Sequence, residues 1–241
     1  ARATVKLPWE TTMMNTVAAD DGWELYNTLE DFSLTHNLAA EFPDRLAAMR
    51  ATFLEEAIAN QVLPLDDRLL ERLLPEAAGR PTMMGDRTAL DLYPGAWHLV
   101  EDSILSIKNV SSSLLARVSV NDDIEADGVI IAQGSRFGGW SFYVDDGYPT
   151  YTYNNLGELA TFKSNQPLGP GDSEIRFDID YDGGGAGKGA TTTLTINGEK
   201  VAGGRLVKTV PARFSIDEGT DVGMDRGSPV IQRQLNDRRF S

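Results

Sequence analysis

The sequence contains no cysteine and only two histidines among its 241 residues. Without cysteine, the chain can form no disulfide, no thiolate metal site and no cysteine nucleophile. The histidines, His36 and His98, lie far apart in the sequence, and neither joins a recognisable catalytic triad. The motifs G-x-S-x-G and H-E-x-x-H are absent as well. The commonest cysteine-based and histidine-based chemistries are therefore not expected in this chain.

Basic residues are also scarce. Lysine and arginine number 22 against 36 aspartates and glutamates, which gives a formal net charge of −14. A phosphate backbone would be repelled by this charge, so we expect no nucleic-acid partner. No apolar run approaches the ~20 residues that a membrane-spanning helix needs, so we expect no membrane partner. The 41% of hydrophobic residues is ordinary for a chain that folds around a core.

Hydrophobic periodicity divides the sequence into residues 1–74, a connector at 75–90, and residues 91–241. In the first region, apolar residues recur at steps of three and four through "FPDRLAAMRATFLEEAIANQV". This spacing, with Pro43 at the start, predicts one amphipathic helix of about four turns. A second helical segment is predicted in "LPLDDRLLERLLPEAAGRP", residues 63–81.

After the connector, the period changes from 3.6 to 2. Short runs rich in β-branched and aromatic residues are separated by turn residues every eight to twelve positions: "SILSIKN", "LLARVSV", "GVIIAQG", "WSFYV", "PTYTYNN" and "LATFKS". This pattern predicts an antiparallel β-sandwich. A parallel sheet would need helices between its strands, and no helical stretch of usable length interrupts these runs. The fold class is therefore mainly β, with an N-terminal α+β segment.

The stretch "DIDYDGGGAGKGATTTLTING", residues 178–198, contains the strongest candidate metal ligands. It is not a phosphate loop, because Gly189 follows the Gly-Lys pair and a strand comes next. It is not an EF-hand, because the same Gly189 occupies the twelfth position, where a bidentate glutamate is needed. Alternation places Asp178, Asp180 and Asp182 on one outward strand face. Two interpretations remain open: these aspartates form a solvated strand face, or they form a calcium site less regular than an EF-hand.

Aromatic residues concentrate on a predicted hairpin that turns at Asp145-Asp146-Gly147. Alternate aromatic residues must face opposite sides of the sheet, so half belong to the core and the other half could stack on a sugar ring. Trp140, Tyr143 and Tyr151 are the candidate substrate-binding residues. A carbohydrate-binding or adhesive β-sandwich module is therefore an alternative function.

Two parts of the sequence together resemble the C-terminal portion of bacterial arylsulfatases, members of the alkaline-phosphatase-like superfamily. "WELYNTLEDFSLTHNLAA" and "EFPDRLAAMRATFLEEA" resemble the end of the catalytic domain, although Thr28, Leu34 and His36 depart from the family pattern. "GVIIAQGSRFGGWSFYVDDGYPTYTYNN", "DYDGGGAGKGATTTLTINGEKV" and "TVPARFSIDEGTDVGMDRGSPV" resemble the sandwich that follows it. The resemblance implies a small antiparallel sheet, the amphipathic helix, and a concanavalin-like or jelly-roll-like sandwich.

The resemblance also implies a sulfate-ester hydrolase as the parent enzyme, with a formylglycine made in a C/S-x-P-x-R motif and a bound calcium ion. None of these catalytic parts matches a residue here, so we expect them upstream of residue 1 and expect this chain alone to be inactive. The implied partner is the catalytic sulfatase domain, on the same or a separate chain. Self-association through an open sheet edge is a further expectation. Bacterial cytoplasm and periplasm are both compatible with the sequence.

Overall fold

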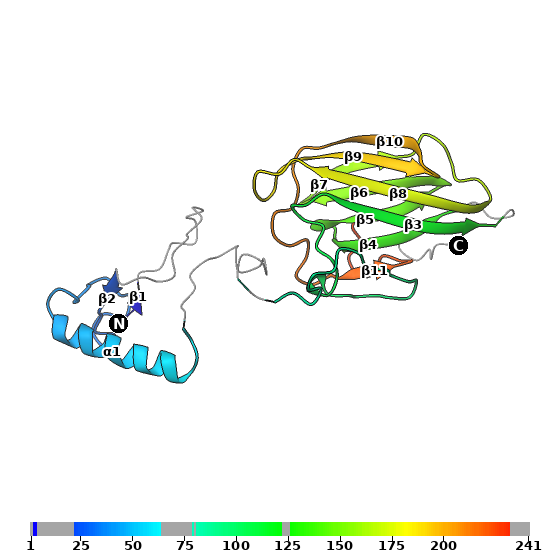
Figure 1. Cartoon of the computed structure of the whole chain (residues 1–241). Helices are drawn as coiled ribbons and strands as arrows, with labels where there is room; N and C mark the ends of the chain where they lie inside the picture. The colour runs from blue at the N-terminus through cyan, green and yellow to red at the C-terminus, as the bar shows by residue number, and fades with distance from the viewer. Residues whose placement is uncertain (1, 4–21, 64–78, 80, 122–125, 232–241) are drawn as a thin grey trace. The chain divides into compact units, whose positions relative to one another are not determined.

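The computed structural model describes residues 2–3, 22–63, 79, 81–121 and 126–231. The chain divides into two compact units, Ala1–Arg72 and Leu73–Ser241 (Figure 1). Almost all of the second helical segment predicted at 63–81 lies outside the described residues. None of the described helices has the length and apolar character needed to cross a membrane.

In its described residues, the first unit contains the predicted small antiparallel sheet and the predicted amphipathic helix. Strand β1 (Arg2–Ala3) pairs with β2 (Trp23–Glu24), and helix α1 spans Pro43–Ala59. Pro43 suits the first turn because its missing N–H would have no helical partner there. The Phe53 ring of α1 meets the Trp23 ring edge-on at 5.3 Å between centroids. This contact ties the helix to the small sheet.

The turn between β2 and α1 is organised by side-chain acceptors. Asp31 accepts the backbone N–H groups of Thr35 and His36 at 3.0 and 2.8 Å. These hydrogen bonds lower the pKa of the Asp31 carboxyl because they favour its ionised form. The Asn37 Oδ1 atom accepts the N–H of Leu25 at 3.0 Å. The segment that resembles the arylsulfatase turn thus has defined local structure.

The second unit is a β-sandwich of two antiparallel sheets, which confirms the predicted fold class (Figure 1). A four-stranded sheet has the order β10-β9-β8-β3, and a five-stranded sheet has the order β11-β4-β5-β6-β7. The strands are β3 (Ser112–Val120), β4 (Gly128–Ser135), β5 (Gly138–Asp145), β6 (Tyr148–Asn155), β7 (Glu158–Lys163), β8 (Gly171–Tyr181), β9 (Ala190–Ile196), β10 (Glu199–Leu206) and β11 (Thr220–Val222).

Two hairpins have the turns that the sequence predicts. Asp146 and Gly147 connect β5 to β6 with φ angles of 51° and 84°. Asn197 and Gly198 connect β9 to β10 with φ angles of 49° and 83°. Positive φ at both central residues is the property of a type I′ turn, whose twist matches that of paired strands. Turn chemistry therefore sets the register of both hairpins.

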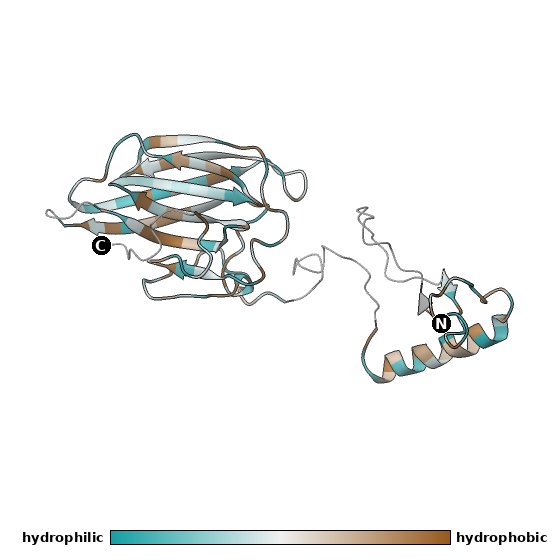
Figure 2. Ribbon diagram, turned by 180° about the vertical axis from the view of Figure 1, so that it is seen from behind, coloured by the Kyte–Doolittle hydropathy of each residue, from teal (hydrophilic) through white to brown (hydrophobic). Residues whose placement is uncertain are grey.

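The core lies between the two sheets. Along β8, Ile175, Phe177 and Ile179 are buried and alternate with partly or fully exposed polar residues. The rings of Phe177 and Tyr151 stack across the sheets with their centroids 3.8 Å apart. Figure 2 shows the same alternation of apolar and polar residues along the strands of the sandwich. Period-2 patterning thus becomes a two-layer apolar core.

The strand predicted in "SILSIKN", residues 103–109, is wrong. A short 3₁₀ helix, η2 (Glu101–Ser103), stands at its start, and no strand follows before β3. Lys108 forms a buried ion pair with Glu101, and the Glu101 Oε2 atom accepts the N–H of Phe214 at 3.0 Å. The alternation of apolar and polar residues in this segment therefore belongs to a folded loop and not to a paired strand.

Candidate functional site

The aspartate row on β8 makes separate contacts along the strand. Asp178 forms an ion pair with Arg176 at 2.8 Å, whereas Asp182 forms one with Arg205. The Arg205 guanidinium lowers the pKa of the Asp182 carboxyl. Asp180 accepts a hydrogen bond from the Ser111 hydroxyl at 3.3 Å. No cluster of three potential metal ligands includes this row in the described part of the chain. The observed geometry is that of a hydrogen-bonded strand face.

The candidate sugar-stacking residues belong to the interior. Trp140, Tyr143 and Tyr151 are 2%, 5% and 0% exposed. The Trp140 Nε1–H donates to the Gln133 Oε1 atom at 2.9 Å, and the Tyr143 hydroxyl lies 3.1 Å from that of Thr152. A sugar ring has no access to these aromatic faces because both sides of β5 are covered. The structure thus places these three residues in the fold rather than on a binding surface.

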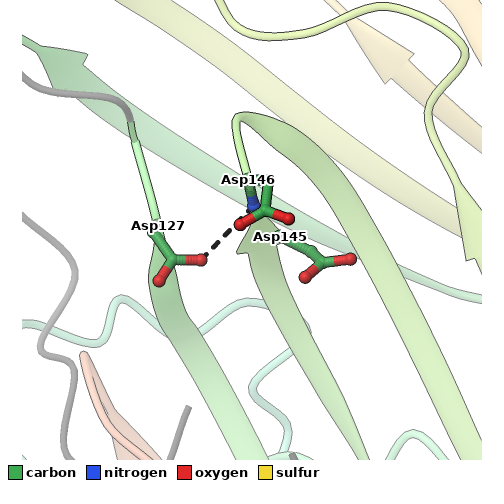
Figure 3. A group of neighbouring side chains, drawn as sticks. All are labelled: Asp127, Asp145 and Asp146. Atoms are coloured by element: carbon green, nitrogen blue, oxygen red, sulfur yellow. Dashed lines mark hydrogen bonds between the residues drawn. The ribbon is translucent and has the colours of Figure 1, made fainter. Parts of the chain in front are cut away.

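A different trio of aspartates does converge. Asp127 immediately precedes β4, Asp145 ends β5, and Asp146 begins the turn into β6 (Figure 3). One carboxylate oxygen from each lies within 4.8 Å of the others. The backbone N–H of Asp146 donates to the Asp127 Oδ1 atom at 3.4 Å, as the dashed line in Figure 3 shows. Pairing of β4 with β5 brings Asp127 to this turn, since Gly128 lies opposite Val144.

One member of this trio has a basic partner. The Lys163 ammonium lies 2.7 Å from the Asp145 Oδ2 atom, and it also sits 5.1 Å from the centroid of the Tyr148 ring. Asp145 is buried, whereas Asp146 is exposed. Carboxylate oxygens suit hard cations such as Ca²⁺, so Asp127, Asp145 and Asp146 are the residues that could hold one. Lys163 would compete for one of these oxygens.

The sequence carries only part of the signal for this cluster. Asp145 and Asp146 are visible as turn residues before a glycine, and their hairpin is predicted correctly. Asp127 lies 18 positions before Asp145, and no motif spacing joins the two. Only the antiparallel register of β4 and β5 brings the third carboxylate close.

The residues of this chain do not fit a formylglycine nucleophile. Cysteine is absent, and the partial match with a hydroxyl residue at the nucleophile position is "TVPAR", where Thr209 occupies it. Thr209 is 7% exposed, and its hydroxyl donates to the Lys188 carbonyl oxygen at 2.8 Å. We therefore place the formylglycine of the arylsulfatase reaction on no residue of this chain.

The first unit exposes large apolar side chains. Of the 17 residues of α1, only Ala57 is buried. Leu54 and Ile58, one helical turn apart, are 45% and 68% exposed. Leu29 and Phe32, in the turn before the helix, are 96% and 92% exposed. We call these four residues the apolar surface of the first unit. Exposed apolar side chains of this size are candidates for contact with another molecule or domain.

Comparison with known proteins gives a loose structural match. No family model matches the sequence, and no curated protein matches it. Among solved structures, the LG1-3 region of the laminin alpha2 chain aligns over 56% of this chain with 14% identity and a TM-score of 0.40. The alignment covers 26% of that chain, about a quarter of its length. The β-sandwich assignment therefore follows from the strand pairing itself, and these comparisons do not bear on the resemblance to arylsulfatases.

Proposed function

We propose that this chain is the C-terminal accessory part of a bacterial arylsulfatase, a hydrolase of sulfate esters. Its role is structural, with the nucleophile and the calcium ion of the reaction supplied by the catalytic domain. The proposal is supported by the resemblance to arylsulfatases in both parts of the chain. The observation that carries it is the apolar surface of the first unit.

In its described residues, the first unit buries few apolar side chains. Its helix buries one residue, and its sheet has two strands of two residues. In proteins, most of the stability of such a helix comes from tertiary packing of its apolar face. The Trp23–Phe53 contact covers one side of α1, while Leu54 and Ile58 remain exposed. A larger catalytic domain that covers these side chains would complete the unit.

The sandwich makes a different contribution under this proposal. Its core is complete without help from the first unit, so it can fold as an appended domain. Loops such as the one at 183–189 would border the access path to the catalytic domain. The Tyr181 hydroxyl holds this loop, because it donates to the Gly185 carbonyl oxygen at 2.6 Å and accepts the Lys188 N–H at 2.8 Å.

The first test is the coding sequence upstream of Ala1. We expect a C/S-x-P-x-R motif there, and its absence would contradict the proposal. The second test uses the full-length enzyme that the upstream coding sequence would specify together with this chain. Leu54→Asp combined with Ile58→Asp should lower the melting temperature and the hydrolysis of 4-nitrophenyl sulfate, because two carboxylates would be forced into an apolar interface.

A matched control uses an exposed apolar residue of the sandwich. Leu115 on β3 is 48% exposed, close to the value for Leu54. Leu115→Asp should change neither property of the full-length enzyme appreciably. Equal effects of the Leu54/Ile58 and Leu115 substitutions would show that the apolar surface of the first unit has no special partner.

The alternative is a carbohydrate-binding or adhesive β-sandwich module. Burial of Trp140, Tyr143 and Tyr151 removes the aromatic surface first assigned to it. Exposed aromatic side chains elsewhere on the sandwich, Tyr93 at 72% and Trp97 at 57%, could still stack on sugars. Quenching of tryptophan fluorescence by neutral sugars would favour this alternative, and no response is expected for the accessory part of a sulfatase.

A further inference from the structure

A β-bulge presents Trp97 and His98 at the edge of the five-stranded sheet. The segment around them runs beside β11, with Ala96 bonded to Val222 at 2.9 Å and Leu99 bonded to Thr220 at 2.7 and 3.0 Å. Between these pairs, Trp97 and His98 together oppose the single residue Asp221. Two residues facing one define a bulge, a feature that redirects side chains at sheet edges.

One buried carboxylate holds this arrangement together. The Asp221 Oδ1 atom accepts the N–H of His98 at 2.6 Å, and its Oδ2 atom accepts the N–H of Arg226 at 2.9 Å. Asp221 is only 8% exposed. It therefore joins two backbone segments that are 128 positions apart in the numbering, at 98 and 226. His98 has a φ of 50°, which is an uncommon conformation for a residue other than glycine.

The side chains on this bulge combine an exposed ring with positive charge. Trp97 is 57% exposed, and the Arg226 guanidinium carbon lies 5.1 Å from the centroid of its ring. The His98 ring lies 6.4 Å from the Trp97 ring. Within the described residues, the Arg226 guanidinium forms no ion pair with a carboxylate. The Arg226 side chain is also exposed.

We propose that Trp97, His98 and Arg226 form a binding site for a ring that carries a sulfate group. The exposed indole would contact the ring, and the guanidinium would bind the sulfate oxygens through paired hydrogen bonds. His98 would donate a third hydrogen bond. Asp221 is a positioning residue, because both of its oxygens already accept backbone amides. The choice of sulfate as the anion depends on the proposed function, whereas the pairing of ring and anion does not.

This placement also answers an electrostatic difficulty. A chain with a net charge of −14 disfavours the approach of an anion, so a sulfate site needs local positive charge. Arg226 and His98 supply donors at the surface, while the carboxylates behind them are engaged with the backbone. Glu218 accepts the N–H of Ser228 at 2.9 Å, and Asp225 accepts the N–H of Val230 at 3.0 Å. The Arg226 guanidinium beside the Trp97 ring therefore supplies the local positive charge that a sulfate site needs.

The test is a calorimetric titration of the 241-residue chain with phenyl sulfate. Trp97→Ala and Arg226→Gln should each weaken binding by about tenfold or more, the loss expected for a charge-assisted contact. Arg226→Gln keeps the backbone N–H that Asp221 accepts, so it tests the charge without disturbing the bulge. Phenol should bind more weakly than phenyl sulfate, and so should inorganic sulfate.

Phe137 and Arg136 provide matched controls. They form a second exposed cation–π pair, with the guanidinium carbon 4.8 Å from a ring that is 66% exposed. Phe137→Ala and Arg136→Gln should leave phenyl sulfate binding unchanged. A titration with galactose 6-sulfate, with galactose as its control, shows whether the site prefers a sugar ring or an aromatic ring beside the sulfate.

Undetectable binding of both sulfate esters would overturn the inference, as would equal binding by the wild type and the Arg226→Gln variant. Inorganic sulfate that binds as tightly as phenyl sulfate would show that the indole makes no ring contact, which would also overturn it. The upstream motif remains an independent test. Its absence would contradict the sulfatase proposal, yet a measured ring-and-anion site would stand.

Discussion

Helix α1 and strand β5 show how differently the two units use their residues. The helix has 17 residues and buries one, Ala57, whereas all eight residues of β5 are buried. Strand β5 lies between β4 and β6 in the sheet and is covered on both faces. The sandwich therefore provides its own apolar environment, while the first unit leaves large apolar side chains exposed. This contrast is the physical basis of the proposed accessory role.

The largest expected effect on stability comes from removing an aromatic ring in the core of the sandwich, compared with removing one in the first unit. Phe177 on β8 is 0% exposed and contacts the rings of Phe142 and Tyr151 in the opposite sheet. Phe177→Ala should lower the free energy of unfolding of the sandwich by ~3–5 kcal/mol, the usual cost of removing a buried phenyl ring. Phe53→Ala in the first unit is the comparison, and we expect it to leave the unfolding transition of the sandwich unchanged. Denaturant unfolding monitored by near-UV circular dichroism measures both.

A reversed result would break the comparison between the units. If Phe53→Ala shifted the unfolding of the sandwich as much as Phe177→Ala, the first unit would contribute to the stability of the sandwich core. The two compact units would then not unfold independently of each other.

The next effect concerns a buried carboxyl near β11. Burial, and secondarily the charges of Asp221 and Glu218, raise the pKa of Asp225 to about 7 from 3.8. Between these values the unfolded chain is ionised while the folded chain keeps the proton, so this group makes stability fall as pH rises from about 4 to about 7. The full loss, on the order of 3–4 kcal/mol, should be present above pH 7.

Asp225→Asn should remove this pH dependence. An amide oxygen can still accept the Val230 N–H, so the variant should match the wild type near pH 4 and exceed its stability at pH 8. Urea unfolding at several pH values measures the difference, with exposed Asp217→Asn as a control. A variant less stable than the wild type at pH 8 would show that the ionised carboxylate is favourable in the folded state.

Two core tyrosines allow a sharper test within the sandwich. The Tyr153 hydroxyl accepts the N–H of buried Val210 at 2.8 Å, whereas the buried Tyr151 hydroxyl has no hydrogen-bond partner among the described residues. Burial raises the pKa of both phenols, so both remain neutral at ordinary pH. Tyr153→Phe should cost ~1–3 kcal/mol because it leaves a buried N–H without an acceptor.

Tyr151→Phe should be neutral or stabilise the sandwich by up to ~1 kcal/mol, since it removes a polar atom that makes no hydrogen bond. Thermal unfolding of the two variants side by side measures the contrast. Equal destabilisation by both substitutions would show that the Tyr151 hydroxyl also has a partner in solution.

The smallest effect is expected at the aspartate trio. Asp146→Asn removes one of three adjacent carboxylates and places asparagine at a positive-φ position that it favours. We expect a gain of no more than ~0.5 kcal/mol, as is usual for surface substitutions. Calorimetric melting with and without added Ca²⁺ measures it. A loss of stability that grows with Ca²⁺ would contradict this expectation and identify the trio as a cation site.

Local sequence patterns predicted the elements more successfully than their contacts. Alternation in "EIRFDIDYD" and the Asn197-Gly198 turn correctly predicted β8 and the β9–β10 hairpin, because period and turn chemistry depend on neighbours in the chain. The same reasoning failed for residues 103–109, where the alternation belongs to a loop held by the buried Lys108–Glu101 pair. Such a contact has no local signature.

The mainly β fold, the amphipathic helix and the lack of cysteine chemistry were determined by the sequence itself, through periodicity and composition. The functional surfaces were decided by tertiary structure. Packing within the sandwich buried Trp140 and Tyr151. The register of β4 against β5 brought Asp127 close to Asp145. Contact between remote segments placed Arg226 over Trp97. Binding surfaces depend on which residues meet across the fold, and one-dimensional spacing does not encode those distances.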